Sequence, residues 1–118
     1  MKRIKAAIVG LAAGAAVIAV PGTAHAASAT TYLFTPNGAH WQIWKTWSSI
    51  GNGKYNLSWG THSRGWGNDT WIRFDLKRRL TSSSSYVTVT GIADYGSSNG
   101  YNKVLFRVCG NSGCSAWW

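Results

Sequence analysis

The stretch Thr70–Arg78, Thr-Trp-Ile-Arg-Phe-Asp-Leu-Lys-Arg, has the clearest regular pattern in the chain. On one side lie Ile72, Phe74 and Leu76, and on the other lie Arg73, Asp75 and Lys77. Successive side chains of a β-strand point to opposite faces of a sheet. The pattern therefore predicts a half-buried strand whose Asp75 sits on the polar face and pairs with a neighbouring basic residue.

Similar alternation recurs on both sides of this strand. Further strands are predicted at Lys54–Gly60, Tyr86–Ile92 and Tyr101–Cys109, with edge strands at Tyr32–Phe34 and Ser115–Trp118. Clusters of Gly, Asn, Ser and Pro separate them at short intervals, and Thr, Val, Tyr and Trp are frequent within them. Short strands and turns at regular spacing are typical of an all-β sandwich or barrel.

One segment, His40–Ile50, fits two patterns. As a strand it places Trp41, Ile43, Lys45 and Trp47 on one face, whereas as a helix it groups Ile43, Trp47 and Ile50. Turn residues flank it on both sides, which favours a strand in a β-meander.

The N-terminus has the three parts of a secretory signal peptide. Three of the first five residues are basic, an apolar run covers Ala6–Val20, and small residues follow up to Ala26. The apolar run is shorter than the roughly 20 residues that span a bilayer as a helix. We therefore predict a leader, residues 1–26, that is removed after Ala26 or alternatively after Ala29. Residues 27–118 then form a single secreted, extracellular domain.

Cys109 and Cys114 are the only cysteines in the sequence. In an exported protein such a pair indicates a disulfide, here across a short Gly-Asn-Ser-Gly turn between two strands. A redox pair would need C-x-x-C spacing, and His40 and His62 do not converge with the cysteines into a four-ligand metal site. We predict a structural disulfide worth about 2 kcal/mol, with no metal and no cofactor.

Parts of the chain resemble a fibronectin type III domain. Leu57-Ser58-Trp59 is similar to strand B of that family, whose Trp lies in the core, and Tyr86–Ile92 is similar to strand E. Tyr101, which opens the next predicted strand, is similar to the tyrosine corner of such sandwiches. The resemblance implies an all-β, Ig/fibronectin type III-like antiparallel sandwich in which Trp59 and Tyr101 have structural roles only.

The resemblance covers about half of residues 27–118 and departs from the family at two places. The disulfide clip across the turn after strand F is not a family feature, and the segment Trp41–Trp47 is rich in Trp where strand A should be plain. The ending Arg107–Trp117 also resembles that of small secreted actinobacterial proteins of unassigned function. That second resemblance implies export and a β fold.

Carboxylates are scarce, with three Asp and no Glu in the sequence. Glycoside hydrolysis generally needs two carboxylates across the scissile bond. Asp75 is expected to pair with basic neighbours, and Asp69 and Asp94 lie in or beside turns. No G-x-S-x-G elbow supports a Ser–His–Asp arrangement around His62. We predict that the protein is not an enzyme and has no catalytic residues.

Aromatic residues are abundant, with eight Trp, five Tyr and three Phe. A domain of this size buries only about 60–65% of its chain surface, so some rings are expected to meet solvent and to form a contact surface. The predicted ligand-binding residues are Trp66, with Arg64 beside it as a hydrogen-bond donor, Trp44, Trp117 and Trp118. Alternatively, Trp41, Trp47, Trp59 and Trp71 form a Trp-rich core with ordinary exposure elsewhere.

The net charge is positive. Three of the twelve basic residues lie in the predicted leader, so nine remain against three Asp, and Lys77–Arg79 is the only basic cluster. Such a charge attracts polyanions or serves solubility alone. An exported protein meets cell-wall polymers and lipid headgroups first, so nucleic acid is not an expected partner.

Two functions remain open at this level. The first is a secreted non-catalytic module that binds an extracellular glycan or an anionic cell-wall polymer through exposed Trp residues. The second is a cationic, Trp-rich antimicrobial protein or toxin that acts on membrane surfaces or cell envelopes. The sequence lacks the basic amphipathic helix that usually carries the second activity.

Overall fold

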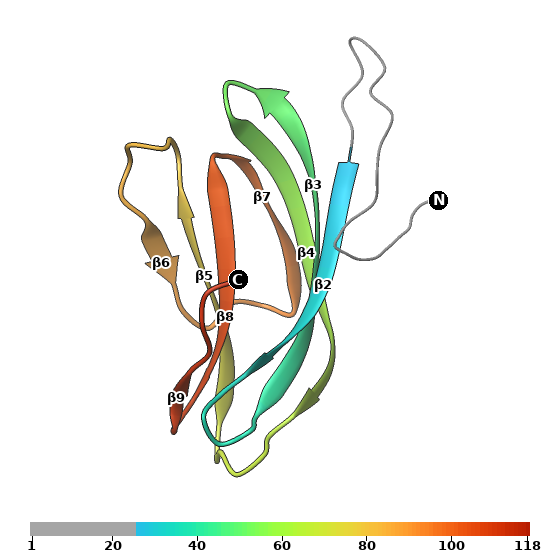
Figure 1. The fold of residues 1–118 in the computed structure, drawn as a ribbon, viewed down its shortest axis with the longest axis vertical. Helices are drawn as coiled ribbons and strands as arrows, with labels where there is room; N and C mark the ends of the chain where they lie inside the picture. Colours follow the sequence, from blue (N-terminus) through green and yellow to red (C-terminus); the bar gives the residue numbers. More distant parts are fainter. Residues whose placement is uncertain (1–25) are drawn as a thin grey trace.

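The computed structural model describes residues 26–118, so the predicted leader lies outside the described part apart from its last residue. All regular structure in residues 26–118 is β-strand, and these residues form no helix long and apolar enough to cross a membrane. Two antiparallel four-stranded sheets face each other, in the orders β2-β3-β4-β7 and β6-β5-β8-β9 (Figure 1). The all-β class and the antiparallel pairing predicted from the sequence are confirmed.

The first sheet holds the long N-terminal strands, and the chain alternates between the sheets thereafter. The strands are β2 (Ala26–Phe34), β3 (His40–Gly51), β4 (Lys54–Gly65), β5 (Ile72–Arg79), β6 (Val87–Val89), β7 (Tyr95–Tyr101), β8 (Lys103–Gly110) and β9 (Gly113–Cys114). After the β2-β3-β4 meander, β5 starts the second sheet, β7 returns to pair with β4, and β8 pairs with β5.

The ambiguous segment at 40–50 is a strand, as the flanking turns favour. It forms β3, which pairs with β2 on one side and β4 on the other. The hairpin to β4 closes through Asn52 and Gly53, whose φ angles are 58° and 71°. Positive φ at both central residues matches the twist of the flanking strands, and Asn-Gly adopts it readily.

The N-terminal edge strand is longer than predicted. β2 contains the predicted edge strand Tyr32–Phe34 but begins at Ala26. Cleavage after Ala26 would leave nearly all of β2 in place, whereas cleavage after Ala29 would shorten it to Thr30–Phe34.

The segment Tyr86–Ile92 differs most from its prediction. Only Val87–Val89 forms a strand, an edge strand in which Val87 is 63% exposed. The strand that pairs with β4 is instead β7, a Gly- and Ser-rich segment whose composition predicts a turn. Glycine is required at position 96 because a Cβ there would lie 2.7 Å from the ring of buried Trp59.

The core between the sheets is built around aromatic rings. Phe74 and Phe106 stack with their centroids 5.3 Å apart and their planes 7° from parallel. Trp59 contacts both rings, and Trp41 packs against Phe74. The remaining buried apolar residues of the cluster are Leu33, Ile43, Leu57, Leu76, Val104 and Val108. The predicted core position of Trp59 is therefore confirmed.

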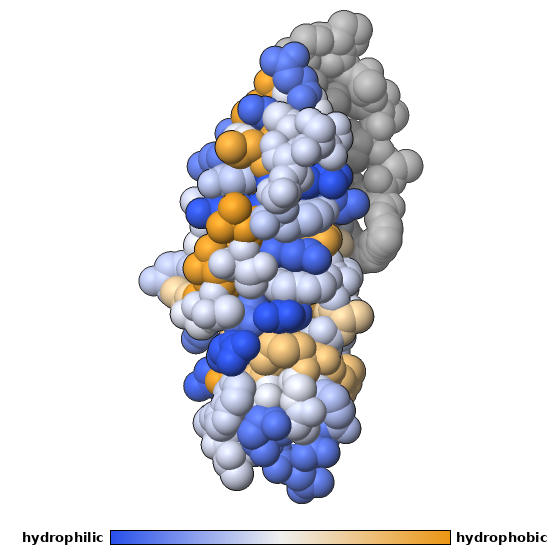
Figure 2. Space-filling view, turned by 90° about the vertical axis from the view of Figure 1, so that its left-hand side faces the viewer, coloured by the Kyte–Doolittle hydropathy of each residue, from blue (hydrophilic) through white to orange (hydrophobic). Residues whose placement is uncertain are grey.

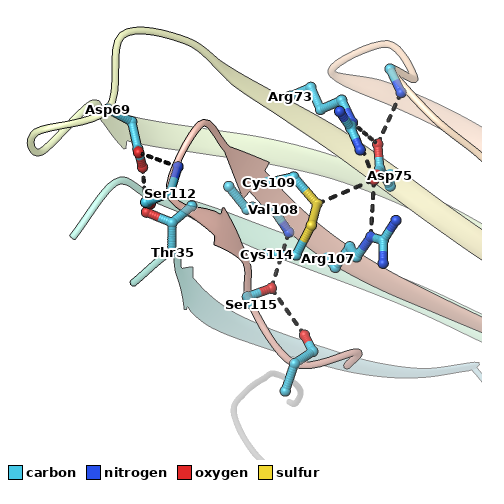
Figure 3. The surroundings of a disulfide bond; sticks show 12 residues. Thr35, Asp69, Arg73, Asp75, Arg107, Val108, Cys109, Ser112, Cys114 and Ser115 are labelled. Carbon is cyan, nitrogen blue, oxygen red and sulfur yellow. Dashed lines mark hydrogen bonds and ion pairs between the residues drawn. A yellow bond between two sulfur atoms is a disulfide. The ribbon is translucent and has the colours of Figure 1, made fainter. Parts of the chain in front are cut away.

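The predicted disulfide joins Cys109 of β8 to Cys114 of β9, which are paired across the sheet (Figure 3). The predicted edge strand at Ser115–Trp118 is not a regular strand. It still follows β8, because Trp118 exchanges two backbone hydrogen bonds with Phe106, each 2.8 Å long.

Asp75 lies on the polar face of β5, as predicted, but it is completely buried there, which the pattern does not predict. Arg73 and Arg107 each donate an Nε–H to its carboxylate at 3.0 Å, and the Gly91 N–H donates at 3.0 Å (Figure 3). The predicted pairing with Arg73 is confirmed. The Cys109 sulfur is 3.3 Å from Oδ2, but a disulfide sulfur carries no proton and is no donor there. Two arginine side chains and the disulfide thus cover this carboxylate.

Asp69 lies between β4 and β5 and links this connection to the β2–β3 and β8–β9 turns, at the end of the molecule opposite the β3–β4 hairpin. Its carboxylate accepts hydrogen bonds from the Thr35 hydroxyl at 2.5 Å and the Ser112 N–H at 3.0 Å. The Thr35 hydrogen bond is the main cause that lowers the pKa of Asp69, burial opposes it, and the Ser112 bonds reinforce it.

Asp75→Asn is expected to lower the free energy of unfolding by about 2–4 kcal/mol, because two partly buried guanidinium groups lose their counter-charge. Asp94→Asn, which removes an exposed carboxylate, should change it by less than about 0.5 kcal/mol. Urea unfolding of the oxidised protein measures both values. Equal stability of the two variants would contradict a stabilising role for the buried carboxylate.

Asp69 is also expected to make stability depend on acid pH. A folded-state pKa below the unfolded value contributes stability that is present above the unfolded pKa of about 3.9 and is lost as pH falls through the folded pKa. The wild-type protein should therefore lose stability more steeply below about pH 4 than Asp69→Asn. Chemical unfolding between pH 7 and pH 2 measures this, and parallel curves would contradict it.

Candidate binding face on the first sheet

The five predicted ligand-binding residues do not come together. Trp44 lies on the outer face of the first sheet, Arg64 and Trp66 lie at the end of β4, Trp117 lies on the outer side of β8, and Trp118 lies between the sheets. The assignments follow from strand alternation, from the pairing of Trp118 with Phe106, and from the contacts below. Of the five, only Trp44 lies among the outward rings of the first sheet.

Trp44 lies down on the sheet because its neighbour has no side chain. It is paired with Gly60 of β4, and a Cβ on Gly60 would lie 2.5 Å from ring atoms of Trp44. The indole therefore covers the glycine backbone with one face and turns the other face outward. Any larger residue at position 60 would push the ring off the sheet.

His40 repeats this arrangement at the other end of β3. It is paired with Gly65, and a Cβ there would lie 2.5 Å from the imidazole. The rings of Tyr32 and Phe34 on β2 lie 6.0 and 5.5 Å from the His40 ring, centroid to centroid. Because Leu33 between them is buried, strand alternation directs both aromatic rings outward.

A further ring completes a row across the sheet. Gly60 is paired on its other side with Tyr95 of β7, which is 77% exposed. The register thus runs Thr30, Trp44, Gly60, Tyr95 over four adjacent strands. We define the aromatic face as the outward rings of this sheet, namely Tyr32, Phe34, His40, Trp44 and Tyr95.

The aromatic face is free of formal charge. β2 and β7 contain no Lys, Arg, Asp or Glu. β3 and β4 contain three such residues, but Lys45 faces inward, Lys54 is at the hairpin end, and Arg64 places its guanidinium 4.9 Å from the ring centroid of core residue Trp41. The outward neighbours of the rings are instead hydroxyl and amide side chains such as Gln42, Thr46 and Ser58.

The outer face of the second sheet has the opposite character. Figure 2 looks onto the side where β6 and β9 lie, and strongly hydrophilic residues lie there between paler ones and patches of hydrophobic residues. Cations lie over aromatic rings in succession: Arg73 over Trp71 (5.3 Å), Arg107 and Lys77 over Trp117 (4.3 and 4.7 Å), and Lys77 and Arg79 over Tyr86 (4.7 and 5.1 Å). Trp117 is therefore half-buried between two cations.

The composition predicts that some aromatic rings are exposed to solvent, and this prediction is confirmed for individual residues. Trp66 and Trp71 are 47% and 41% exposed, and Trp47 is half-buried, so the alternative four-Trp core is wrong. Trp66 stands in a loop fixed to the β2–β3 turn by the hydrogen bond from Asn68 N–H to Asn37 O. Arg64 was predicted beside Trp66, but the ring under its guanidinium is Trp41.

Sequence reasoning missed most of the aromatic face. Tyr32 and Phe34 flank a buried Leu, and this alternation predicts that both rings point away from the core. His40 and Tyr95 gave no such signal, because their role depends on which glycines lie opposite them in the folded sheet.

The described residues contain one cluster with metal-ligand atoms, formed by Asp75, Cys109 and Cys114. The two sulfurs are bonded to each other, so the cluster offers only a carboxylate that two arginines already hold.

Tyr101 packs against the core with Arg78 4.5 Å from its ring, and no hydrogen bond from its hydroxyl is seen within residues 26–118.

No family model, curated protein or solved structure matches this chain.

The Hα protons of Gly60 are expected to resonate upfield of ordinary glycine protons, because they lie under the Trp44 indole and feel its ring current. Trp44→Leu should return them to ordinary positions, whereas Trp66→Leu, which removes an exposed indole elsewhere, should leave them unchanged. Proton NMR of the folded domain measures the shifts. Ordinary Gly60 shifts in the wild-type protein would contradict the flat placement of the ring.

Proposed function

We propose that this protein is a secreted, non-catalytic module that binds an uncharged polysaccharide of a cell wall or extracellular matrix through the aromatic face. The observation that carries the proposal is the indole of Trp44, which lies flat over Gly60 in a row with Tyr95 among outward side chains without charge.

The chemistry of this face suits sugars. The faces of a pyranose ring present C–H groups that stack on aromatic rings, and its equatorial hydroxyls hydrogen-bond to polar side chains around them. The extended, shallow arrangement suits a polymer chain or an insoluble surface rather than a single small molecule. Without cations, the face offers no preference for an anionic ligand.

Binding without catalysis agrees with the placement of the carboxylates. Asp69 and Asp75 are buried and hydrogen-bonded, which leaves Asp94 as the exposed carboxylate of the described chain. Hydrolysis with two carboxylates on either side of a glycosidic bond therefore has no support here. Most cations of the second sheet, though not Lys103, lie over aromatic rings or bind Asp75, and residues 26–118 form no amphipathic helix, which makes the envelope-disrupting alternative the weaker one.

An Ig/fibronectin type III-like sandwich and export both belong to this proposal. The crossing that pairs β4 with β7 and β5 with β8 supports a Greek-key sandwich. In such a sandwich β7, rather than the segment 86–92, takes the place of strand E. A disulfide is typical of an oxidising compartment, which supports secretion into the extracellular space.

The mature domain is expected to be retained on at least one insoluble neutral glycan among cellulose, chitin and isolated cell walls, and to stay bound in 1 M NaCl. Trp44→Ala and Tyr95→Ala should each weaken retention by about five- to tenfold, because each removes a stacking ring. Gly60→Ala should weaken it as well, since it keeps the indole but lifts it off the sheet. Depletion isotherms with each solid measure the affinity.

Trp71→Ala is the matched control, because it removes an exposed indole that lies beside the second sheet, next to β5. Its retention should equal that of the wild-type protein. Loss of binding in Trp71→Ala but not in Trp44→Ala would contradict the proposed face, and so would retention that 1 M NaCl abolishes.

A further inference from the structure

A pocket lies between the sheets beneath the β3–β4 hairpin. This hairpin extends past the β7–β8 turn (Figure 1). The pocket has a volume of about 390 Å³. Its walls include the cations Lys45, Arg79 and Lys103 and the rings of Trp47, Tyr55 and Tyr101. None of these residues belongs to the aromatic face, and the proposed binding of neutral glycans does not depend on them.

The pocket combines three cations with aromatic walls. Lys45, Arg79 and Lys103 line it, and no carboxylate does. Within residues 26–118 the ion pairs are those of Asp75 with Arg73 and Arg107, so none of the three lining cations has an acidic partner. The positive charge of this pocket is therefore not neutralised by the protein itself.

The neighbouring groups hold the pocket in shape. Asn102 accepts a hydrogen bond from Arg79 Nε at 2.8 Å and donates one to Gly53 O at 2.9 Å, which ties the end of β5 to the hairpin. Lys45 points inward from β3, with its ammonium 4.1 Å from the ring centroid of Trp118. An aromatic ring attracts a cation but does not cancel its charge.

We propose that this pocket binds an anionic sugar unit, one that carries a carboxylate or a phosphate, with the anion on Lys45, Arg79 and Lys103 and the sugar ring against Tyr55, Tyr101 or Trp47. The like charges of Lys45, Arg79 and Lys103 repel one another in a half-enclosed site, and a bound anion relieves that repulsion. Hydrogen bonds to charged donors are also the stronger class. This second site would let the module bind acidic glycans as well as neutral ones.

The titration of Lys45 supports the same site. Burial, and secondarily the charge of Lys103, lower the pKa of Lys45 to about 8. The groups around it are Lys103 and Arg79 at the pocket, Trp47 on its own strand, and Phe106 and Trp118 from the second sheet. A bound anion favours the protonated amine, so binding should take up protons near pH 8 and weaken as pH rises from 7 to 9.

The test is calorimetric titration of the folded domain with glucuronate and with glucose 6-phosphate at low ionic strength. One or both should bind, and Lys45→Met and Lys103→Gln should each weaken that binding about tenfold or more, because each removes a charged donor. Lys54→Met is the matched control, since it removes the same charge from the hairpin end without lining the pocket. Its affinity should stay within about twofold of wild type.

Glucose and inorganic phosphate separate the contributions of ring and anion. Glucose should not bind in the pocket, and inorganic phosphate should bind more weakly than glucose 6-phosphate. Equal affinity for phosphate and sugar phosphate, equal losses in Lys54→Met and Lys45→Met, or no binding of either acidic sugar would each overturn the proposal. Near-UV circular dichroism checks that the variants are folded. The proposed binding of neutral glycans through Trp44 is tested separately, so a failure of the pocket proposal does not contradict it.

Discussion

The stacked pair of Phe74 and Phe106 occupies the middle of the molecule, and the rest of the structure is arranged around it. Two facing sheets are about 10 Å apart, and this space is filled by the two phenyl rings with Trp41 and Trp59 packed against them. The interior therefore has no room for the other twelve aromatic rings of the chain. They lie at the edges of the core or on the two outer faces, and how they are distributed there sets what each face can bind.

The two outer faces treat these rings in opposite ways. On the second sheet, cations lie over Trp71, Tyr86 and Trp117 and cover part of each ring. On the first sheet the rings lie among uncharged residues, and Trp44 and His40 lie down over glycines. A ring supported from below and open above is ready for a partner, because little conformational freedom is lost when a ligand stacks on it. The domain thus has one outer face on which cations cover the aromatic rings and another on which the rings lie among uncharged residues.

Much of the fold was predictable from local pattern, because alternation and turn residues are local properties. The strand at 72–79 and the strand nature of 40–50 followed from it, whereas the disulfide followed from the cysteine pair and the buried Trp59 from the resemblance to a fibronectin type III domain. The burial of Asp75 could not be predicted, since Arg107 and Gly91 cover it from distant parts of the sequence. β7 was missed for a related reason: its Gly and Ser residues predict a turn, but Gly96 is required by the ring of Trp59 in the neighbouring strand. Of the candidate site, Trp44 was identified from the sequence, whereas the glycine beneath it and Tyr95 beside it depend on strand register.

The central claim is that neutral sugars stack on the outer rings of the first sheet. The most direct measurement is a titration of the domain, labelled with ¹³C in its aromatic side chains, with soluble cello- and chito-oligosaccharides. The ring signals of Trp44, Tyr95 and His40 should shift together with one saturation curve, while those of Trp71 and Trp117 stay in place. Shifts confined to Trp71 and Trp117, or unchanged ring signals with every neutral oligosaccharide, would contradict it.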